Sequence, residues 1–255
     1  MTSMDMPLRT ERPPRIHREL ASTRRVQLSD DAPVVNYMDK PTFVAEQYRS
    51  LALQIEERVN PLGPLGPLGA RGYTLTVTSA EEGAGKTLTS LNLALTLTRG
   101  EERRVLLLEG DLWRPQLHTY FTPERPDRPG LQQVLERRAT VADAVVTLEG
   151  SSLDVLLAGA SEVAGDLMSG RRMSEVLNEA RAAYEIVVID SPPMTLLASA
   201  RSLAARSDGV VMVVRAGQSK RHDIEKALSA LGPEKLIGAV LNFAPISARG
   251  YRGYY

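Results

Sequence analysis

A strand, a glycine-containing loop and a helix follow one another in the segment 73–99, and this order constrains the fold more than any other feature. A β-branched run ends at Ser79, a short loop follows, and a leucine-rich stretch begins within ten residues. Gly83 and Gly85 free the backbone to turn and to approach a ligand closely. Such a loop binds phosphate, because its N–H groups and the helix N-terminus face the ligand. The segment therefore predicts a phosphate-binding loop of the relaxed Walker A type, with Ala80 in place of the first glycine.

The predicted loop also carries the side chains that nucleotide binding requires. Lys86 is placed to reach the β- and γ-phosphates, and the hydroxyl of Thr87 is placed to contact Mg²⁺. We therefore expect ATP and Mg²⁺ as cofactors. The loop and first helical turn predicted to contact the nucleotide comprise Glu82, Gly83, Ala84, Gly85, Lys86, Thr87 and Leu88.

Apolar runs and helical stretches alternate along the rest of the chain. Continuously apolar strands separated by helices are typical of a parallel sheet that is covered on both faces. We therefore expect an α/β P-loop NTPase fold with a mainly parallel sheet, similar to MinD/ParA proteins. The expected strands are 75–78, 105–109, 153–158, 186–190, 209–215 and 236–242, and the expected helices are 40–59, 87–99, 130–147, 168–182, 196–206 and 221–231.

Two carboxylates follow expected strands at their carboxyl ends, where such sheets bind ligands. Asp111 lies two residues beyond the run 105–109, and Asp190 ends the run 186–190. Mg²⁺ takes oxygen ligands and commonly binds one or two carboxylates together with phosphates and water. Each acid alone could cap the next helix. The pair together with the loop predicts a metal site formed by Thr87, Asp111 and Asp190.

Composition excludes several other classes of protein. The formal net charge of the 255-residue chain is zero, so its overall charge favours neither nucleic acid nor an acidic membrane. The absence of cysteine excludes disulfides and thiolate metal sites. The chain contains no apolar run of about 18 residues. The N-terminal region lacks an apolar signal core, so we expect a cytoplasmic protein.

The sequence divides into a domain and two tails. Residues 1–40 are rich in Arg, Pro, Ser and Asp and are predicted to be disordered. Residues 41–245 are predicted to form the nucleotide-binding domain, with the Pro-Leu-Gly repeat at 61–69 as a loop. Residues 246–255 are predicted to form a flexible, tyrosine-rich tail.

Three segments together resemble the Walker A, Walker A′ and Walker B motifs of the bacterial tyrosine kinases (BY-kinases). They read SAEEGAGKT, LLLEGDLWRPQLH and VVIDSPPM. BY-kinases are P-loop proteins that control capsule and exopolysaccharide export, so the resemblance implies an ATP-dependent protein-tyrosine autokinase. The resemblance extends from about Lys40 to Asn242 and also includes a C-terminal tyrosine cluster. This cluster would supply the phosphoacceptors Tyr251, Tyr254 and Tyr255.

The resemblance also implies the catalytic roles. Lys86 would bind the phosphates and Asp111 the metal, and Asp190 would orient a metal-bound water. Glu109 would accept the proton of the attacking hydroxyl. Arg114 would neutralise transition-state charge, or would be a structural arginine at a strand end.

Asn242 is predicted to contact adenine, with a satisfied loop amide as the alternative.

Several motif positions depart from the BY-kinase pattern. Glu82 replaces a proline and Ala84 a glutamate in Walker A, while Glu109 replaces an aspartate and Trp113 an arginine in Walker A′. Glutamate keeps the carboxylate but lengthens the arm by one methylene. Positioned catalysis is sensitive to such shifts, so we expect Glu109→Asp to raise phosphotransfer.

The resemblance further implies partners. These are a membrane polysaccharide co-polymerase that activates the kinase and recruits it to the inner face of the plasma membrane, a cognate tyrosine phosphatase and further copies of the chain. The ring-assembly motif Glu-x-x-Arg-x-x-Arg is matched by Glu46 and Arg49, but Ala52 replaces its last arginine. Two alternatives stay open. One is a non-catalytic ATP-binding regulator, and the other is a MinD/ParA-like ATPase, which Glu81 at the signature-lysine position opposes.

Overall fold

The computed structural model describes residues 25–34, 42–59, 72–99, 103–122, 128–159 and 167–245. Its strands are β1 (Arg25–Leu28), β2 (Tyr73–Ser79), β3 (Val105–Glu109), β4 (Phe121–Thr122), β5 (Val146–Leu148), β6 (Leu153–Leu156), β7 (Ile186–Asp190), β8 (Gly209–Arg215) and β9 (Leu236–Asn242). Its helices are α2 (Phe43–Val59), α3 (Lys86–Leu97), α4 (Leu131–Leu135), α5 (Val141–Ala144), α6 (Arg171–Ala183), α7 (Ala198–Arg206) and α8 (Arg221–Ser229), with 3₁₀ turns η1 (Leu117–Tyr120) and η2 (Pro233–Lys235).

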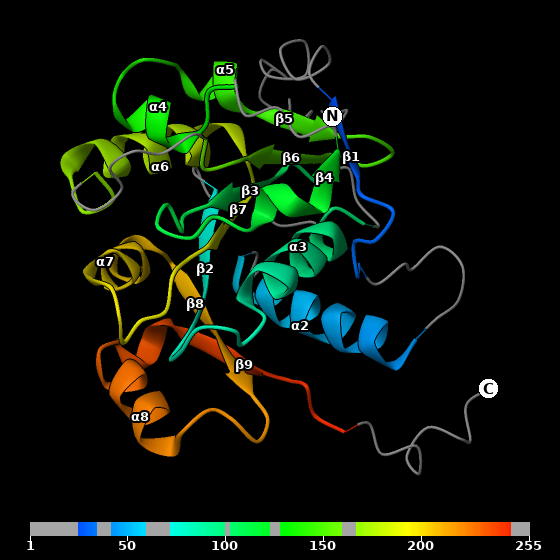
Figure 1. Ribbon diagram of the computed structural model, residues 1–255, viewed down its shortest axis with the longest axis vertical. Helices are drawn as coiled ribbons and strands as arrows, with labels where there is room; N and C mark the ends of the chain where they lie inside the picture. The colour runs from blue at the N-terminus through cyan, green and yellow to red at the C-terminus, as the bar shows by residue number, and fades with distance from the viewer. Residues whose placement is uncertain are drawn as a thin grey trace, which may run out of the picture.

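These strands form one sheet in the order β4-β1-β5-β6-β3-β7-β2-β8-β9 (Figure 1). Neighbours from β6 to β9 are parallel, whereas β1–β4 and β5–β6 pair antiparallel. The chain passes from β2 through α3 to β3 on one side, and β8 lies on the other side of β2. Open α/β sheets bind ligands at such a reversal, outside the carboxyl ends of the strands. The predicted mainly parallel α/β sheet is confirmed.

Alternation along the strands places apolar side chains on both faces of the sheet. In β3, Val105 and Leu107 pack with α2 and α3, while Leu106 and Leu108 pack with α4 and α6. Helices α2 and α3 cover one face and α4, α6 and α7 lie on the other (Figure 1). Because both faces are covered, β3 and β7 are buried along their whole length, which explains their apolar runs before the acid that ends each strand.

Two expectations about the elements are wrong. The expected helix 130–147 is divided into α4 and α5, because Arg137 adopts a left-handed φ of 63° and ends the first of them. Its last residues belong to strand β5 instead. In the expected N-terminal tail, residues 25–28 form β1, which pairs with both β4 and β5. Val26 is buried in the core, so sheet pairing outweighs the polar composition of this segment.

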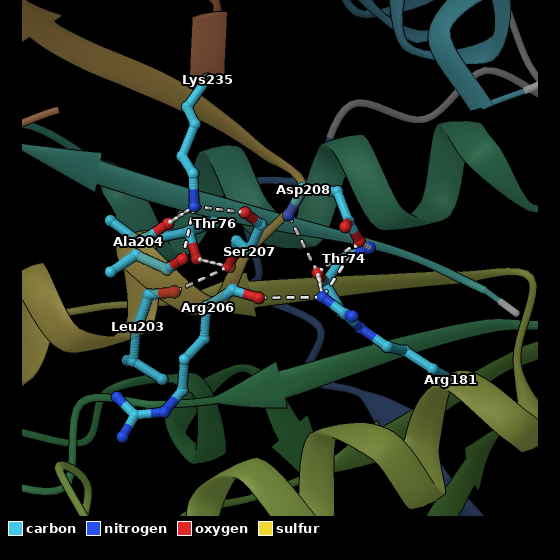
Figure 2. A network of polar contacts seen from close by, with 10 residues as sticks. Thr74, Thr76, Arg181, Leu203, Ala204, Arg206, Ser207, Asp208 and Lys235 are labelled. Atoms are coloured by element: carbon cyan, nitrogen blue, oxygen red, sulfur yellow. Dashed lines mark hydrogen bonds and ion pairs between the residues drawn. The ribbon is translucent and has the colours of Figure 1, made fainter. Parts of the chain in front are cut away.

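A polar network closes the opposite end of the sheet from the predicted site. Figure 2 shows Arg181 of α6 directed at Asp208, with 3.1 Å between Nη2 and Oδ2. Thr74 of β2 donates to the same Asp208 oxygen from its N–H and its hydroxyl, both at 2.8 Å. Lys235 donates to the carbonyl of Ser207 at 3.0 Å, just beyond the end of α7. The network ties α6, α7, β2 and β8 together, and it holds the strands whose other ends form the site.

Several expectations fall outside the described residues. These are the tail segments 1–24 and 35–40, the Pro-Leu-Gly loop 61–69, and the tail 246–255 with Tyr251, Tyr254 and Tyr255. Within the described ranges, no helix has both the length and the apolar character needed to cross a bilayer.

Candidate active site

The loop between β2 and α3 has the backbone shape that a phosphate-binding loop needs. Gly83 and Gly85 have φ values of 72° and 88°, a left-handed region that favours glycine. A Cβ atom on Gly85 would lie 2.7 Å from Nδ2 of Asn242, so a larger residue would also collide with β9. Gly85 is the N-cap of α3 and has no side chain to satisfy the first helical N–H groups. Those N–H groups are therefore available to an anion.

Lys86 begins α3 and is only 8% exposed. Burial lowers the pKa of its ammonium, while Asp190, Asp111, Glu82 and Glu81 oppose that shift electrostatically. The lysine therefore lies among four carboxylates. These carboxylates favour the charged form of Lys86, which places a positive charge at the loop, where the phosphates of a nucleotide would be.

Asp190 ends β7 and is almost completely buried. Its Oδ1 accepts a hydrogen bond from the hydroxyl of Ser90 at 3.2 Å. Burial raises the pKa of Asp190 to about 7, and Glu109 adds to this shift, while a hydrogen bond from Thr87 lowers it. The predicted metal residues Thr87 and Asp190 are thus in contact through side chains.

Asp111 is positioned by the turn that follows β3. Its Oδ1 accepts hydrogen bonds from the N–H groups of Trp113 at 3.2 Å and Arg114 at 3.0 Å. Burial raises the pKa of Asp111, whereas these hydrogen bonds and the charge of Lys86 lower it. The carboxylate is therefore fixed at the carboxyl edge of the sheet and interacts electrostatically with the loop lysine.

Arg114 forms an ion pair with Glu82 across the mouth of the loop. Both side chains are exposed, so the contact itself contributes little to stability. Its position is more informative, because it brings the Walker A′ arginine to the phosphate loop. Trp113, at the family's arginine position, is 55% exposed beside it.

Glu109 is buried and its carboxylate is directed at backbone groups. Oε1 accepts from the N–H of Leu117 at 2.6 Å, and Oε2 accepts from the N–H of Ala158 at 2.9 Å. A further hydrogen bond comes from the N–H of Gln116. Burial nevertheless raises the pKa of Glu109 to about 7. Both oxygens are engaged in holding two loops, and its role as a catalytic base stays a prediction.

Strands β8 and β9 hold the loop from the other side. Asn242 donates from Nδ2 to the carbonyl of Ala84 and to Oγ1 of Thr89, each at 3.0 Å. Nη1 of Arg215 donates to the carbonyl of Gly83 at 2.9 Å. Asn242 was predicted to contact adenine, and in this structure its amide nitrogen supports the loop itself.

Sequence reasoning missed three contributors to this site: Arg215, Ser90 and Ser219. Ser219 donates to a carboxylate oxygen of Glu81, the residue at the signature-lysine position of MinD/ParA proteins. Arg215 ends a strongly apolar strand, a position that could have been recognised by the same rule that found Asp190. Ser90 occupies the second turn of α3 and has no comparable signal in the sequence.

The arrangement fits a nucleotide with its metal. The loop contains two glycines at positions where a side chain would be strained, and a buried lysine follows them. Two carboxylates lie at or just beyond the ends of the neighbouring strands β3 and β7. In the described part of the chain, no three His, Cys, Asp or Glu residues gather closely enough to hold a metal alone. Asp111, Asp190 and Thr87 would therefore need phosphate oxygens to complete a Mg²⁺ site, as is usual for Mg²⁺ bound with a nucleotide.

Comparison with known proteins agrees with this geometry. Residues 73–231 match the AAA domain family. The chain is 32% identical over 225 residues to tyrosine-protein kinase YwqD of Bacillus subtilis (strain 168), covering 87% of this chain and 90% of that protein. It belongs to the bacterial tyrosine kinase family. The resemblance predicted from the three motifs is thereby confirmed.

Solved structures of bacterial tyrosine kinases share the fold. The BceF tyrosine kinase domain superposes with a TM-score of 0.64 at 25% identity, covering 79% of this chain and 78% of that one. The chimerical protein CapA2B2 has a TM-score of 0.71 at 23% identity, covering 90% of this chain and 100% of that one, and shows the fold alone. The predicted P-loop fold of a bacterial tyrosine kinase is therefore confirmed.

Proposed function

We propose that this protein transfers the γ-phosphoryl group of ATP to tyrosine hydroxyls, including those of its own C-terminal tail. The observation that carries the proposal is the convergence of Lys86, Asp111 and Asp190 at the ends of three adjacent parallel strands or their connections. This set supplies one cation for phosphates and two carboxylates for a metal. Phosphoryl transfer depends mainly on such positioning and charge.

In this proposal each residue has a defined task. Lys86 binds the β- and γ-phosphate oxygens, and the left-handed loop presents its N–H groups to them. Asp111, Asp190 and Thr87 would hold Mg²⁺, which when bound neutralises phosphate charge during transfer. Arg114 leaves Glu82 and pairs with phosphate oxygens when a nucleotide is present. Its position at the loop mouth supports that exchange.

Glu109 has a positioning task in this proposal. Its carboxylate joins the start of η1 to the segment after β6, and Asp111 and Arg114 lie on the loop that follows Glu109. Phosphoryl transfer passes through a loose transition state that is stabilised mainly by the metal and by cations. The reaction can therefore proceed without a general base at this position.

The acceptors that we propose are Tyr251, Tyr254 and Tyr255. Strand β9 ends at Asn242, beside the phosphate loop, and about a dozen residues separate it from the last tyrosine. An extended chain of that length spans roughly 40 Å, which reaches a neighbouring protomer. Each phosphorylation would add about 1.5 to 2 negative charges, so a labelled tail would repel other labelled tails and weaken an assembly.

We also propose the partners that the family resemblance implies. They are a membrane polysaccharide co-polymerase that activates the kinase at the inner face of the plasma membrane, further copies of the chain, and a tyrosine phosphatase that resets it. Relevant to assembly is α2, where Glu46 and Arg49 pair at 3.2 Å within the helix. Ala52 of the same helix is buried and uncharged, so this position offers no charge to a neighbour.

An ATP-binding regulator without transferase activity is the second candidate. The specific observation in its favour is the engagement of both Glu109 oxygens with backbone N–H groups. Incubation with γ-labelled ATP and Mg²⁺ separates the candidates. Label on tyrosine supports the kinase, label released as phosphate indicates an ATPase, and nucleotide binding without either supports the regulator.

A further inference from the structure

Phe243, directly after β9, has an unusual conformation and surface. Its φ is 57°, in the left-handed region that bulky residues avoid. Its side chain is 63% exposed, which is more than for any other large apolar side chain in the described part of the chain. A strained backbone persists where the surrounding structure determines it, and such residues concentrate at functional sites. An aromatic ring held in this way suggests a role in binding.

Two contacts fix the ring beside the phosphate loop. The guanidinium carbon of Arg215 lies 4.2 Å from the ring centroid, a cation–π arrangement. Nη1 of the same arginine donates to the carbonyl of Gly83 at 2.9 Å. Cε2 of the ring lies 3.6 Å from the position that a Cβ of Gly85 would occupy. The ring therefore lies beside Gly85 and is connected to Gly83 through Arg215.

The strands hold this arrangement in register. Arg215 ends β8 and pairs directly with Asn242, the last residue of β9. The N–H of Ala216 donates to the carbonyl of Asn242 at 2.9 Å, which extends the pairing beyond the strands. Asn242 in turn donates to the loop carbonyl of Ala84. Phe243 is thus connected to two residues that contact the loop, to Asn242 through the main chain and to Arg215 through its side chain.

We propose that Phe243, supported by Arg215, is the stacking surface for the base of the nucleotide whose phosphates the loop binds. The proposal rests on the proposed function, because it needs a nucleotide at this loop. A phenyl ring cannot bind phosphate, but it offers an apolar face to a planar base. The guanidinium of Arg215 lies over one face of the ring and holds it in place, and it adds a cation to a stack formed on the other face.

Stacking of this kind has two consequences. Every base has a π-face, so the ring strengthens binding of ATP and GTP alike and does not select between them. A base-free polyphosphate gains nothing from the ring. Removal of one stacking partner typically weakens binding by about five- to 150-fold.

The test compares ligands with and without a base on the full chain. Isothermal titration calorimetry measures Mg²⁺ complexes of ATP, GTP and inorganic tripolyphosphate with wild type, Phe243→Ala and Phe243→Tyr. Leu241→Ala is the matched control, because Leu241 is a 60% exposed apolar residue on β9, two residues before Phe243. Tripolyphosphate binding to each variant also shows whether its loop is intact.

We expect Phe243→Ala to weaken the binding of ATP and of GTP about fivefold or more and to leave the binding of tripolyphosphate unchanged. Phe243→Tyr and Leu241→Ala should bind all three ligands as wild type does. Equal losses for ATP and tripolyphosphate would overturn the proposal, because Phe243 would then act through the shape of the loop. Unchanged ATP affinity would overturn it as well, and would leave the exposed ring to a protein partner. Failure of wild type to bind ATP would instead contradict the proposed function.

Discussion

The carboxylate of Glu109 accepts a hydrogen bond of 2.6 Å from the backbone N–H of Leu117. Its second oxygen accepts from the N–H of Ala158, so one buried side chain joins the Walker A′ loop to the segment after β6. The extra methylene of glutamate extends the carboxylate toward both loops. The departure from the family's aspartate thus has a structural explanation.

Shortening this side chain is expected to reduce activity. Glu109→Asp withdraws the carboxylate by one methylene and cannot keep both hydrogen bonds, so the loop with Asp111 loosens. We expect phosphotransfer to fall about tenfold or more, because small misplacements are costly in positioned catalysis. This reverses the expectation drawn from the sequence alone.

Rate measurements and hydrogen exchange at Leu117 and Ala158 check this prediction together. Glu225→Asp, a surface substitution on α8, should change neither. A faster Glu109→Asp enzyme with unchanged exchange would contradict the positioning role.

Stability should depend on pH through the same residue. The pKa of Glu109 is raised from 4.5 to about 7 by burial, so the folded protein binds more protons there than the unfolded chain between these values. Its contribution to stability is full below about pH 4.5 and is lost as pH rises through 7. We therefore expect the unfolding midpoint of nucleotide-free, Mg²⁺-free protein to fall over this range. Glu109→Gln, which does not titrate, should show a shallower fall, and identical slopes would refute the prediction.

Lys86 should separate binding from folding. Lys86→Met removes the charge for the phosphates but keeps a similar stem, and it also removes the cost of burying an ammonium. We expect ATP binding to be lost while the unfolding temperature is unchanged or higher. Calorimetric titration and thermal unfolding measure the two effects, with the exposed Lys226→Met as control. Near wild-type ATP affinity in folded Lys86→Met would defeat the phosphate-loop assignment.

Glu82 should oppose nucleotide binding. It stands where the family has proline, and its carboxylate pairs with Arg114 at the loop mouth. Glu82→Gln removes a negative charge near the triphosphate and releases Arg114, so we expect ATP affinity to rise about three- to tenfold at low salt. Arg114→Ala should lower it. Titrations at two salt concentrations test both variants, and weaker binding by Glu82→Gln would count against the exchange of Arg114 between Glu82 and phosphate.

The sequence predicted the central sheet well because its physical signals are local. Parallel strands buried on both faces favour apolar runs, and all six expected strands agree with β2, β3, β6, β7, β8 and β9 to within two residues at each end. Strand β1 was missed because RVQL has only one deeply buried side chain, Val26, and gains its structure from pairing with β4 and β5.

The site was predicted in part for the same reason. Lys86, Asp111 and Asp190 follow from loop chemistry and from strand ends. The direction of a side chain does not follow from the strand end that bears it. Glu109 lies beside Asp190 in register, yet its two oxygens accept hydrogen bonds from the backbone N–H groups of Leu117 and Ala158, which belong to two other loops. The contacts of Arg215 and Phe243 with the loop depend in the same way on tertiary packing.

Transfer between two copies of the chain tests the central claim most directly. Lys86→Met protein with an intact tail is mixed with active protein that lacks residues 246–255, together with ATP, Mg²⁺ and the membrane activator. Phosphotyrosine is then mapped by mass spectrometry. The account predicts label on Tyr251, Tyr254 and Tyr255 of the Lys86→Met chain, increasing with the concentration of the active partner. Release of phosphate to water, or bound ATP without any labelled tyrosine, would contradict it.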